Sequence, residues 1–539
     1  MSDCRSPQTD RFVHDRLPSS GNWPEILPLP GVPLTGPLNC VSFLLDRHLE
    51  GDTAHREAIV SDTRRWTYEQ LANRVGRIAR LMVDDYGIEP GNRVLIRGAN
   101  SPEVAAIWLA VQKIGAIAVT TMSLLRAAEL RTIAKMAKPA LAFCDVALTS
   151  DLRDAIGVLD VELPVVSYGA ESGELFRLIE RRQPVNGTCA TLADDISLIA
   201  FTSGTTGQPK ATVHFHRDVL AICETVGRHI LSPEPDDVFI GTPPLAFTFG
   251  LGGLLVFPLQ VGACTVLNSQ YSPEGLLSAI DHYKATVCFT VPTFFQQMLM
   301  RQDLPQLEHL RLAVSSGEAL PLPTREEWRS ATGFELTEVI GSTEMLHAFA
   351  GATGSNVRAG FIGPAIPGYE LSIIDDDGNA LAPDQIGRLA VKGPTGCRYL
   401  DDPRQTDYAQ DGWNLTGDAC SMSADGYIAY HTRYDDMIIS AGYNISGLEV
   451  ENALLEHPKV VECAVIGEPD TERGQIVVAH VVLNDTSVGL DGMAHELQEH
   501  VKRAIAPYKY PRRIKFSNRL PRNESGKIQR FRLREAAKN

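Results

Sequence analysis

Nine residues, 202–210, carry the side chains of this sequence that are best suited to bind a ligand. They include four hydroxyl residues, two glycines and, at the end, Lys210. Glycines let the backbone turn its N–H groups toward a ligand, hydroxyls donate hydrogen bonds, and the lysine ammonium adds a positive charge. This composition predicts a loop that binds a polyphosphate. An ordinary turn rich in glycine, serine and threonine is the alternative interpretation.

The loop differs from a Walker A loop, in which a lysine and then a serine or threonine directly follow the second glycine. Here Gln208 and Pro209 separate Gly207 from Lys210, and Ala211 follows the lysine. The loop is therefore of another kind, and its function depends on the motifs that come after it.

Strand and helix patterns alternate around this loop. Helix-start signals lie between apolar runs, for example Thr67 with Gln70 three residues later. The runs predicted to be strands are 93–98, 116–121, 140–144, 196–200, 286–291, 310–314 and 334–340. Such alternation indicates a largely parallel α/β structure, in which ligands bind at the carboxyl ends of strands. The loops 315–320 and 341–344 are expected at such ends, as is the phosphate loop.

The length of 539 residues is too great for one hydrophobic core, so several domains are expected. Residues 1–37 are rich in proline and predict an extended arm. Residues 38–434 predict a large N-terminal domain of layered, mostly parallel sheets with helices, including a β subdomain at about 369–434. Residues 435–539 predict a small α+β C-terminal domain.

Composition excludes several classes of function. A formal charge of −16 argues against binding to nucleic acid or to an anionic membrane surface. The ten cysteines show no Cys-x-x-Cys pair, which disfavours a zinc site or a disulfide framework. The uncharged segment 238–273 is interrupted by prolines and glycines, so it is expected in the protein core. Without a visible signal peptide, we expect a cytoplasmic protein.

The C-terminal residues 501–539 differ from the rest of the chain in charge, with thirteen lysines and arginines against two acids. A solvated surface, an arm for nucleic acid, or a binding surface for a polyanionic cosubstrate are the three interpretations.

Five more motifs follow the phosphate loop. They are Gly317-Glu318-Ala319, Gly341-Ser342-Thr343-Glu344, Trp413-Asn414-Leu415-Thr416-Gly417-Asp418, Arg433 with Asp435, and Pro521-Arg522-Asn523-Glu524-Ser525-Gly526-Lys527. In this order the motifs resemble the adenylate-forming superfamily, which includes acyl-CoA ligases, peptide-synthetase adenylation domains and firefly-type luciferases. The resemblance covers residues 38 to 534, nearly the whole chain. It departs at Ala211 and Ile340, where the family commonly has glycine and tyrosine.

The resemblance implies an ATP site. The residues around the β- and γ-phosphates would be Thr202, Ser203, Gly204, Thr205, Thr206, Gly207 and Lys210. The adenine segment would be Gly317, Glu318 and Ala319, and the residues beside the α-phosphate would be Gly341, Ser342 and Thr343. Glu344 would hold Mg²⁺, and Asp418 and Arg433 would bind the ribose.

The resemblance also implies that the small C-terminal domain is mobile. Lys527 on this domain would be catalytic in adenylation, together with Thr343 and Glu344. Asp435 would be the hinge, and Gly442 would open the channel for the pantetheine arm of coenzyme A. A domain that swings between two steps would exchange these two faces over one cleft.

The chemistry of these residues is consistent with formation of an acyl adenylate and then of a thioester. A carboxylate is already a nucleophile at neutral pH, so its attack on the α-phosphorus of ATP needs no general base. Charge develops on the phosphate oxygens and the pyrophosphate, where Mg²⁺ on Glu344 and a lysine can neutralise it. The acyl adenylate then loses AMP to a thiol and gives a thioester.

Two segments indicate which acid is activated. Residues 247–252 and 341–348 resemble benzoate-type CoA ligases, and residues 214–218 with 243–250 resemble the 2-aminobenzoate–CoA ligase branch more closely. The predicted pocket residues are Thr248, Phe249, His347 and Ala348. Phe249 could stack on an aryl ring, and His347 could hydrogen-bond the carboxylate or an ortho group. A histidine satisfied in the core is the equally open interpretation.

The sequence therefore predicts an ATP-dependent aryl-CoA ligase for 2-aminobenzoate that uses Mg²⁺ and coenzyme A and is either a monomer or a homodimer. Benzoate and 2-hydroxybenzoate are alternative acids, and a carrier-protein thiol is an alternative acceptor. A nucleotide-binding protein that has lost its chemistry is a third hypothesis. It is disfavoured because Lys210, Glu344, Asp418, Arg433 and Lys527 are all present.

Overall fold

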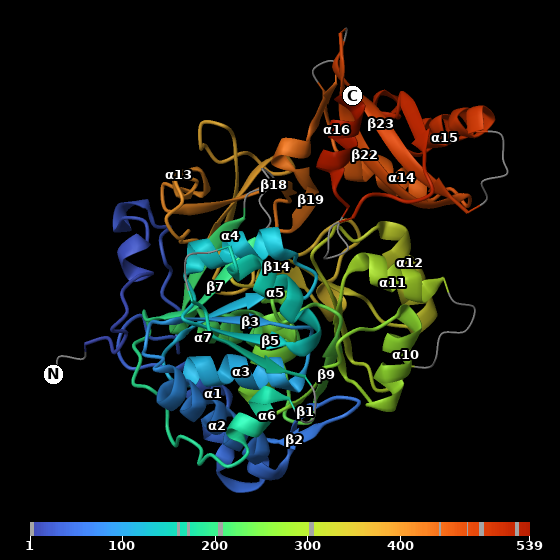
Figure 1. Ribbon diagram of the computed structural model, residues 1–539. Helices are drawn as coiled ribbons and strands as arrows, with labels where there is room; N and C mark the ends of the chain where they lie inside the picture. Colours follow the sequence, from blue (N-terminus) through green and yellow to red (C-terminus); the bar gives the residue numbers. More distant parts are fainter. Residues whose placement is uncertain are drawn as a thin grey trace.

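The computed structural model describes residues 5–158, 162–169, 173–202, 209–300, 307–440, 443–471, 473–484, 490–522 and 528–538. Figure 1 shows a large N-terminal part, coloured blue to brown, with a smaller C-terminal part in orange and red above it. The fold is mixed α/β, as predicted, with two large sheets in the N-terminal part, a third antiparallel sheet, and a fourth sheet in the C-terminal part.

The six-stranded sheet leads to the phosphate loop. Its strands are β3 (Arg93–Arg97), β4 (Ile117–Thr121), β5 (Leu141–Asp145), β6 (Val165–Tyr168), β7 (Ile196–Thr202) and β8 (Lys210–Phe215). They lie in the order β6-β5-β3-β4-β7-β8, and all neighbours are parallel except β7 and β8. The predicted strand at 196–200 is confirmed and extends to Thr202.

The eight-stranded sheet carries the other predicted loops. Its strands are β1 (Glu57–Val60), β2 (Arg65–Thr67), β9 (Val238–Gly241), β10 (Cys264–Val266), β11 (Val287–Thr290), β12 (Leu312–Ser315), β13 (Thr337–Gly341) and β14 (Ala348–Ala352). The order is β14-β13-β12-β11-β9-β10-β1-β2, with β14 and β2 antiparallel to their neighbours at the two edges. The loops after β12 and β13 therefore leave the same edge of the sheet.

Helices cover these sheets. They are α1 (Cys40–Leu44), α2 (Tyr68–Tyr86), α3 (Pro102–Lys113), α4 (Ala127–Ala137), α5 (Thr149–Ile156), α6 (Glu174–Ile179), α7 (His216–Ile222), α8 (Thr248–Leu251), α9 (Phe257–Val261), α10 (Pro273–His282), α11 (Pro292–Leu299) and α12 (Leu322–Thr332). At the start of α2, the Thr67 hydroxyl accepts from Gln70 N at 3.2 Å, and the Gln70 side chain accepts from Thr67 N at 3.0 Å. The predicted capping box is confirmed.

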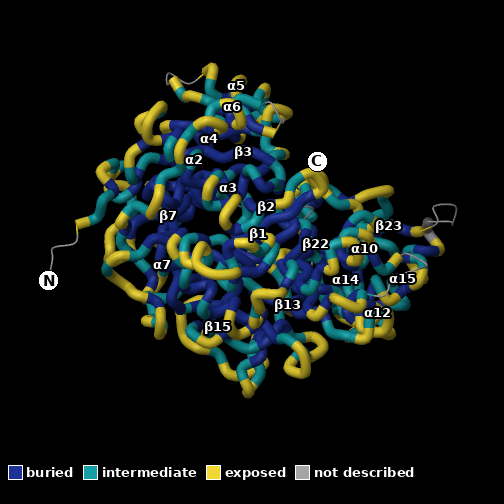
Figure 2. Tube along the Cα trace, turned by 90° about the horizontal axis from the view of Figure 1, so that it is seen from below, coloured by how far each residue is buried: buried dark blue, intermediate teal, exposed yellow. Residues whose placement is uncertain are grey.

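Residues 238–267 of the uncharged segment lie largely in the core, as predicted, whereas Ser269, Gln270 and Ser272 near its end are exposed. Helix α8 continues through a π-helical turn (Gly252–Val256) into α9, and Leu254, Leu255 and Phe257 have no exposed surface. No helix in the described ranges combines the length and apolar character that crossing a membrane needs. Figure 2 shows buried backbone concentrated along the strands and exposed backbone at the periphery.

The chain after β14 forms the third and fourth sheets. The antiparallel third sheet holds β15 (Glu370–Ile374), β16 (Gly387–Lys392), β17 (Ala409–Gln410), β18 (Trp413–Met422) and β19 (Ile428–Arg433), with α13 (Gln405–Tyr408) beside it. The C-terminal part holds β20 (Ile438–Ser440), β21 (Tyr443–Ile445), β22 (Val460–Asp470), β23 (Gly474–Leu483) and β24 (Arg513–Phe516). Its helices are α14 (Gly447–Leu455), α15 (Leu490–Ala504) and α16 (Arg530–Lys538).

Many cations of the basic C-terminal segment are paired with acids of the same part of the chain. The pairs are Lys509 with Glu449, Arg513 and Lys515 with Glu468, Arg530 with Glu451, and Arg534 with Asp436. These cations stabilise the C-terminal fold, which disfavours both a nucleic-acid arm and a broad surface for a polyanion.

The N-terminal arm is anchored to the six-stranded sheet by buried side chains. The Gln8 side chain donates to Ile196 O at 2.7 Å and accepts from Ile196 N at 3.1 Å, at the start of β7. Val13 is fully buried. An arm that only rests on the surface would not account for these contacts, so the arm is part of the folded domain.

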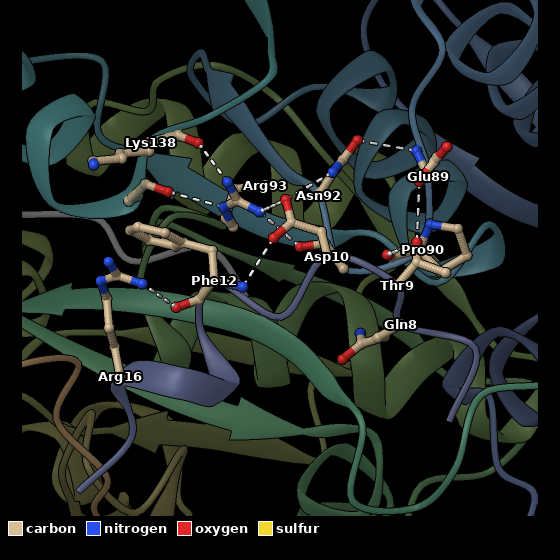
Figure 3. Close-up of polar contacts among 12 residues, drawn as sticks. Gln8, Thr9, Asp10, Phe12, Arg16, Glu89, Pro90, Asn92, Arg93 and Lys138 are labelled. Carbon is tan, nitrogen blue, oxygen red and sulfur yellow. Dashed lines mark hydrogen bonds and ion pairs between the residues drawn. The ribbon is translucent and has the colours of Figure 1, made fainter. Parts of the chain in front are cut away.

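Asp10 makes the main ionic contact of the arm (Figure 3). Its carboxylate accepts from Arg93, from Asn92 Nδ2 at 2.9 Å and from Phe12 N at 2.9 Å. The Arg93 guanidinium lies 4.8 Å from the centre of the Phe12 ring and is nearly buried. Partial burial favours protonation of Asp10, but the hydrogen bonds from Arg93 and Phe12 hold its pKa below its ordinary value.

Replacement of Asp10 by alanine should lower the free energy of unfolding by about 1–3 kcal/mol, because Arg93 would keep a buried charge without its carboxylate. Urea unfolding of Asp10→Ala and of the control Asp15→Ala would measure this. Asp15 pairs with Arg11 in solvent, so its loss should cost no more than about 0.5 kcal/mol. Equal effects of the two substitutions would contradict a stabilising role for the arm.

Candidate active site

The phosphate loop begins and ends on two paired residues. Thr202 at the end of β7 lies directly opposite Lys210 at the start of β8. The residues predicted between them, Ser203, Gly204, Thr205, Thr206 and Gly207, lie outside the described residues. The hairpin therefore fixes both ends of the loop at the carboxyl end of a strand, where ligands of α/β sheets bind.

Lys210 and Glu344 lie on either side of the Tyr399 hydroxyl. The Lys210 ammonium is 3.3 Å from Tyr399 Oη, and Tyr399 Oη donates to Glu344 Oε1 at 2.6 Å. Burial and the neighbouring Glu344 carboxylate raise the pKa of Tyr399, so its hydroxyl keeps the proton that it donates. A half-buried cation, a buried donor and a buried carboxylate thus form one chain.

The loop after β13 is held from the six-stranded sheet. His214 Nε2 donates to Thr343 O at 2.7 Å, and its other ring nitrogen faces Asp218 Oδ2 at 3.5 Å. Ser342 Oγ lies 3.3 Å from the Tyr408 hydroxyl. His214 therefore has a structural task, which is to position the backbone of Thr343.

The same loop is tightly turned. A Cβ atom at Gly341 would lie 2.5 Å from His347 O, so a larger residue does not fit there. Leu346 has a positive φ of 65°, a conformation that is uncommon outside glycine. Strain of this kind concentrates at binding and catalytic sites because the surrounding structure has to enforce it.

The predicted adenine segment follows β12. Gly317 has a φ of 91°, which favours glycine, and Ala319 is two residues further along. The Glu318 carboxylate accepts from Thr293 Oγ1 at 2.6 Å, at the start of α11. The side chain of Ser316 donates to Val339 O at 2.9 Å and ties this segment to β13.

The predicted ribose residues face each other in the third sheet. Asp418 on β18 pairs with Arg433 on β19, and Arg433 NH1 donates to Asp418 Oδ1 at 2.6 Å. The Asp418 charge raises the pKa of Arg433. A Cβ atom at Gly417 would lie 2.6 Å from Arg433 NH2, so the glycine leaves room for this pair.

Asp435 lies in the short turn Tyr434–Asp436 between β19 and β20, where the chain passes into the C-terminal part. Gly442 and Lys527 lie outside the described residues. Their predicted roles in the coenzyme A channel and in adenylation remain predictions.

The predicted acyl pocket is lined by rings. His347 lies 5.6 Å from Phe249 and 4.9 Å from Phe257, measured between ring centres, and Phe249 lies 5.3 Å from Phe289. Thr248 begins α8 and Ala348 begins β14, and both are buried. A Cβ atom at position 252 would lie 2.4 Å from His347 Cδ2, so Gly252 lets the imidazole lie against α8.

His347 is buried without a hydrogen-bond partner for either ring nitrogen among the described residues. Burial lowers the pKa of His347 to about 4, so the ring is neutral at pH 7. A neutral imidazole offers one donor and one acceptor, and leaving them unpaired costs about 1–3 kcal/mol. Such a group is suited to bind a polar atom of a ligand.

The residues that could hold a metal ion are few. Within the described ranges, no three His, Cys, Asp or Glu side chains gather into a metal cluster. Magnesium commonly binds through one or two carboxylates together with phosphate oxygens. Glu344, buried at the end of the Lys210–Tyr399 chain, fits that pattern.

The sequence did not indicate Tyr399 or Arg398. The Arg398 guanidinium lies between the rings of Trp23 and Phe215, 4.6 and 4.5 Å from their centres, and so fixes the residue beside Tyr399. The available signal was a buried-looking tyrosine after a glycine-rich turn, which is too common to indicate a role.

Comparisons with known proteins agree with this geometry. A family model described as AMP-binding enzyme matches residues 45–398, and a model described as AMP-binding enzyme C-terminal domain matches residues 449–527. Together the two models cover both the large N-terminal part and the small C-terminal part of the structure.

Three relatives illustrate the range of the similarity. Benzoate–CoA ligase of Thauera aromatica is 32% identical over 514 residues, which are 94% of this chain and 98% of that protein. The mitochondrial acyl-coenzyme A synthetase ACSM5 of Homo sapiens is 34% identical over 87% of this chain and 84% of that protein. A crystal structure of an anthranilate CoA ligase in complex with anthranoyl-AMP superposes with a TM-score of 0.88 at 31% identity, over 93% of this chain and 97% of that one.

Because His347 is buried, the stability of the protein should depend on pH. Its folded pKa of about 4 lies below its ordinary value of 6.5, so the unfolded chain binds the proton more tightly. Stability should therefore fall as the pH is lowered from 6.5 toward 4. The fall should be smaller in His347→Gln, and urea unfolding of both proteins across this range would measure the difference. Parallel curves for the two proteins would contradict a buried neutral imidazole.

Proposed function

The chain belongs to the AMP-binding enzyme family and is an acid–thiol ligase of the aryl-CoA type, and we propose that its acid is 2-aminobenzoate. ATP and coenzyme A are the cosubstrates. The single observation that carries the choice of acid is His347, a buried neutral imidazole with two unpaired nitrogens among aromatic rings.

The proposed first step joins the acid to AMP. The carboxylate attacks the α-phosphorus, an oxygen–phosphorus bond forms, and the bond to pyrophosphate breaks. Lys210 and Thr202, which hold the two ends of the phosphate loop, would bind the β- and γ-phosphates, and Thr343 would contact the α-phosphate. Mg²⁺ held by Glu344 would supply positive charge against the phosphate oxygens.

Tyr399 suits this step because its two partners, Lys210 and Glu344, would exchange its hydroxyl for groups of the nucleotide. Its hydroxyl occupies the space between Lys210 and Glu344 in the described structure. The Lys210 ammonium and the Glu344 carboxylate therefore each have a partner within the protein. Asp418 and Arg433 would hold the ribose from the third sheet, and residues 317–319 would hold the adenine.

The proposed second step transfers the acyl group to sulfur. The thiolate of coenzyme A attacks the acyl carbon, a carbon–sulfur bond forms, and the bond to AMP breaks. Lys527 would serve the first step, and the face that carries Asp435 and Gly442 would serve the second. A carrier-protein thiol would undergo the same chemistry, so the acceptor has to be tested directly.

An aromatic acid suits the pocket because flat rings pack against Phe249 and Phe289. An amino or hydroxyl group beside the carboxylate would give His347 a hydrogen-bond partner, whereas plain benzoate offers only its carboxylate. Ala348 is small and buried, which would leave room for such a group. These features favour 2-aminobenzoate, with 2-hydroxybenzoate next and benzoate after it.

A panel of acids would test the proposal. With ATP, Mg²⁺ and coenzyme A, pyrophosphate release should be fastest with 2-aminobenzoate, slower with 2-hydroxybenzoate and benzoate, and slowest with medium-chain fatty acids. Coenzyme A should be consumed in step with AMP release, and its replacement by a phosphopantetheinylated carrier protein should stop turnover. A preference for a fatty acid would overturn the aromatic pocket.

The size of residue 348 should set the choice between acids. Ala348→Ile should lower kcat/KM for 2-aminobenzoate about tenfold relative to benzoate, since added methylenes fill the space for the ring substituent. The ratio of the two acids within one variant controls for folding and for ATP binding. An unchanged ratio would place the substituent elsewhere.

Lys527 should act in one step only. Lys527→Ala should lower acyl-adenylate formation by about 100-fold or more, since a positive charge on the transferring phosphate is lost. Thioester formation from supplied acyl adenylate and coenzyme A should stay within a few-fold of the unchanged protein. Equal loss of both half-reactions, each measured separately, would contradict a lysine that serves adenylation alone.

A further inference from the structure

Arg522 lies between acidic residues of the two parts of the chain. Its guanidinium contacts the Glu462 carboxylate on β22, in its own C-terminal part. Its other terminal nitrogen lies 3.7 Å from Glu318 Oε1, in the segment after β12 of the N-terminal part. All three side chains are largely buried, with 27%, 23% and 16% of the Arg522, Glu462 and Glu318 surfaces exposed.

The Glu318 carboxylate is held in place independently of Arg522, and the backbone next to Glu462 is also tied to the N-terminal part. Thr293 donates to Glu318 Oε2 from its hydroxyl at 2.6 Å and from its backbone N–H at 3.3 Å, at the start of α11. Further along α11, the Gln296 side chain donates to Val461 O, the residue before Glu462, at 3.3 Å. The same helix therefore touches both sides of the Arg522 contact.

This is a place where the two parts of the chain meet. Helix α12 from the N-terminal part lies beside α14 from the C-terminal part, as Figure 2 also shows. Apart from these helices, the contacts described here are polar. A polar interface of this kind suits two bodies that have to separate and rejoin.

Arg522 is also joined to the backbone next to Lys527. Arg522 and Ile528 form an isolated antiparallel bridge, and Gln529 N donates to Pro521 O at 2.8 Å. Lys527 precedes Ile528 in the sequence. Holding Arg522 against Glu318 therefore fixes Ile528 and Gln529, which follow Lys527 in the sequence, relative to the adenine segment.

We propose that Arg522 is a positioning residue for the adenylation step, because it neutralises one carboxylate from each part of the chain and so holds the C-terminal part over the nucleotide site. Without it, Glu318 and Glu462 would face each other across the interface with no cation between them, and like charges disfavour contact. The inference rests on the proposed function, and it adds a residue that holds the domain arrangement but touches neither the acid nor the phosphates.

The test measures the two half-reactions separately in Arg522→Gln. Acyl-adenylate formation should fall about tenfold, the change expected for the loss of one charge-assisted hydrogen bond. Its KM for the acid should be unchanged, since the acyl pocket is not altered. Thioester formation from supplied acyl adenylate and coenzyme A should remain within about twofold, which also shows that the variant is folded.

Two further variants and one control distinguish an effect of the Arg522 charge from a general effect on folding. Arg522→Lys keeps one positive charge and should recover part of the adenylation rate. The double variant Arg522→Gln with Glu462→Gln removes one of the two repelling carboxylates and should be faster in adenylation than Arg522→Gln alone. Arg532→Gln changes an exposed arginine of the same part of the chain and should leave both half-reactions unchanged.

Three outcomes would overturn the inference. They are equal loss of both half-reactions, no loss of adenylation, and a double variant no faster than the single one. The unchanged protein distinguishes this failure from a failure of the proposed function. If it forms an acyl adenylate, only the role of Arg522 is wrong. If it forms none with any acid of the panel, the proposed function itself has failed.

Discussion

The hydroxyl of Tyr399 is the interaction on which the candidate site depends, because three sheets meet there. Lys210 comes from the six-stranded sheet, Glu344 follows β13 of the eight-stranded sheet, and Tyr399 lies between β16 and β18 of the third sheet. A half-buried ammonium and a buried carboxylate each lose solvation, and the hydroxyl between them gives both a partner. The position of each sheet is therefore coupled to the positions of the other two.

Buried histidines in this chain show how a binding group differs from a structural one. His214 donates to Thr343 O, and His216 accepts from Cys40 N at 3.2 Å, so each has a partner within the protein. His347 is as deeply buried but has no such partner among the described residues. Since buried polar groups are normally hydrogen-bonded, His347 is suited to bind a polar atom of a ligand.

Local patterns in the sequence were sufficient for much of the fold. The strand before the phosphate loop, the capping box at Thr67 and the largely buried residues 238–267 were all predicted correctly, since each depends on residues close together in the chain. The family and the class of reaction were also predicted correctly, because six motifs in order are hard to obtain by chance.

The contacts that assemble the site could not be predicted in this way. Tyr399 and Glu344 are 55 residues apart, and no periodicity relates them. The sequence could not decide whether His347 was a satisfied core residue, because that depends on what surrounds both ring nitrogens. The arm was expected on the surface, yet Gln8 completes the backbone hydrogen bonding at the start of β7. The predicted roles of the phosphate-loop residues, Gly442 and Lys527 stay predictions.

Ion pairs within the C-terminal part of the chain differ in their role from an ion pair that joins it to the N-terminal part. Among the described residues, many cations of the C-terminal part are paired with acids of the same part, and these pairs stabilise that part by itself. Arg522 also pairs across to the N-terminal part. An interface that rests on polar contacts costs little to open, and each ion pair across it then has a large effect on which arrangement is populated. Among the described residues, contacts of this kind would let one cleft serve the two proposed steps in turn.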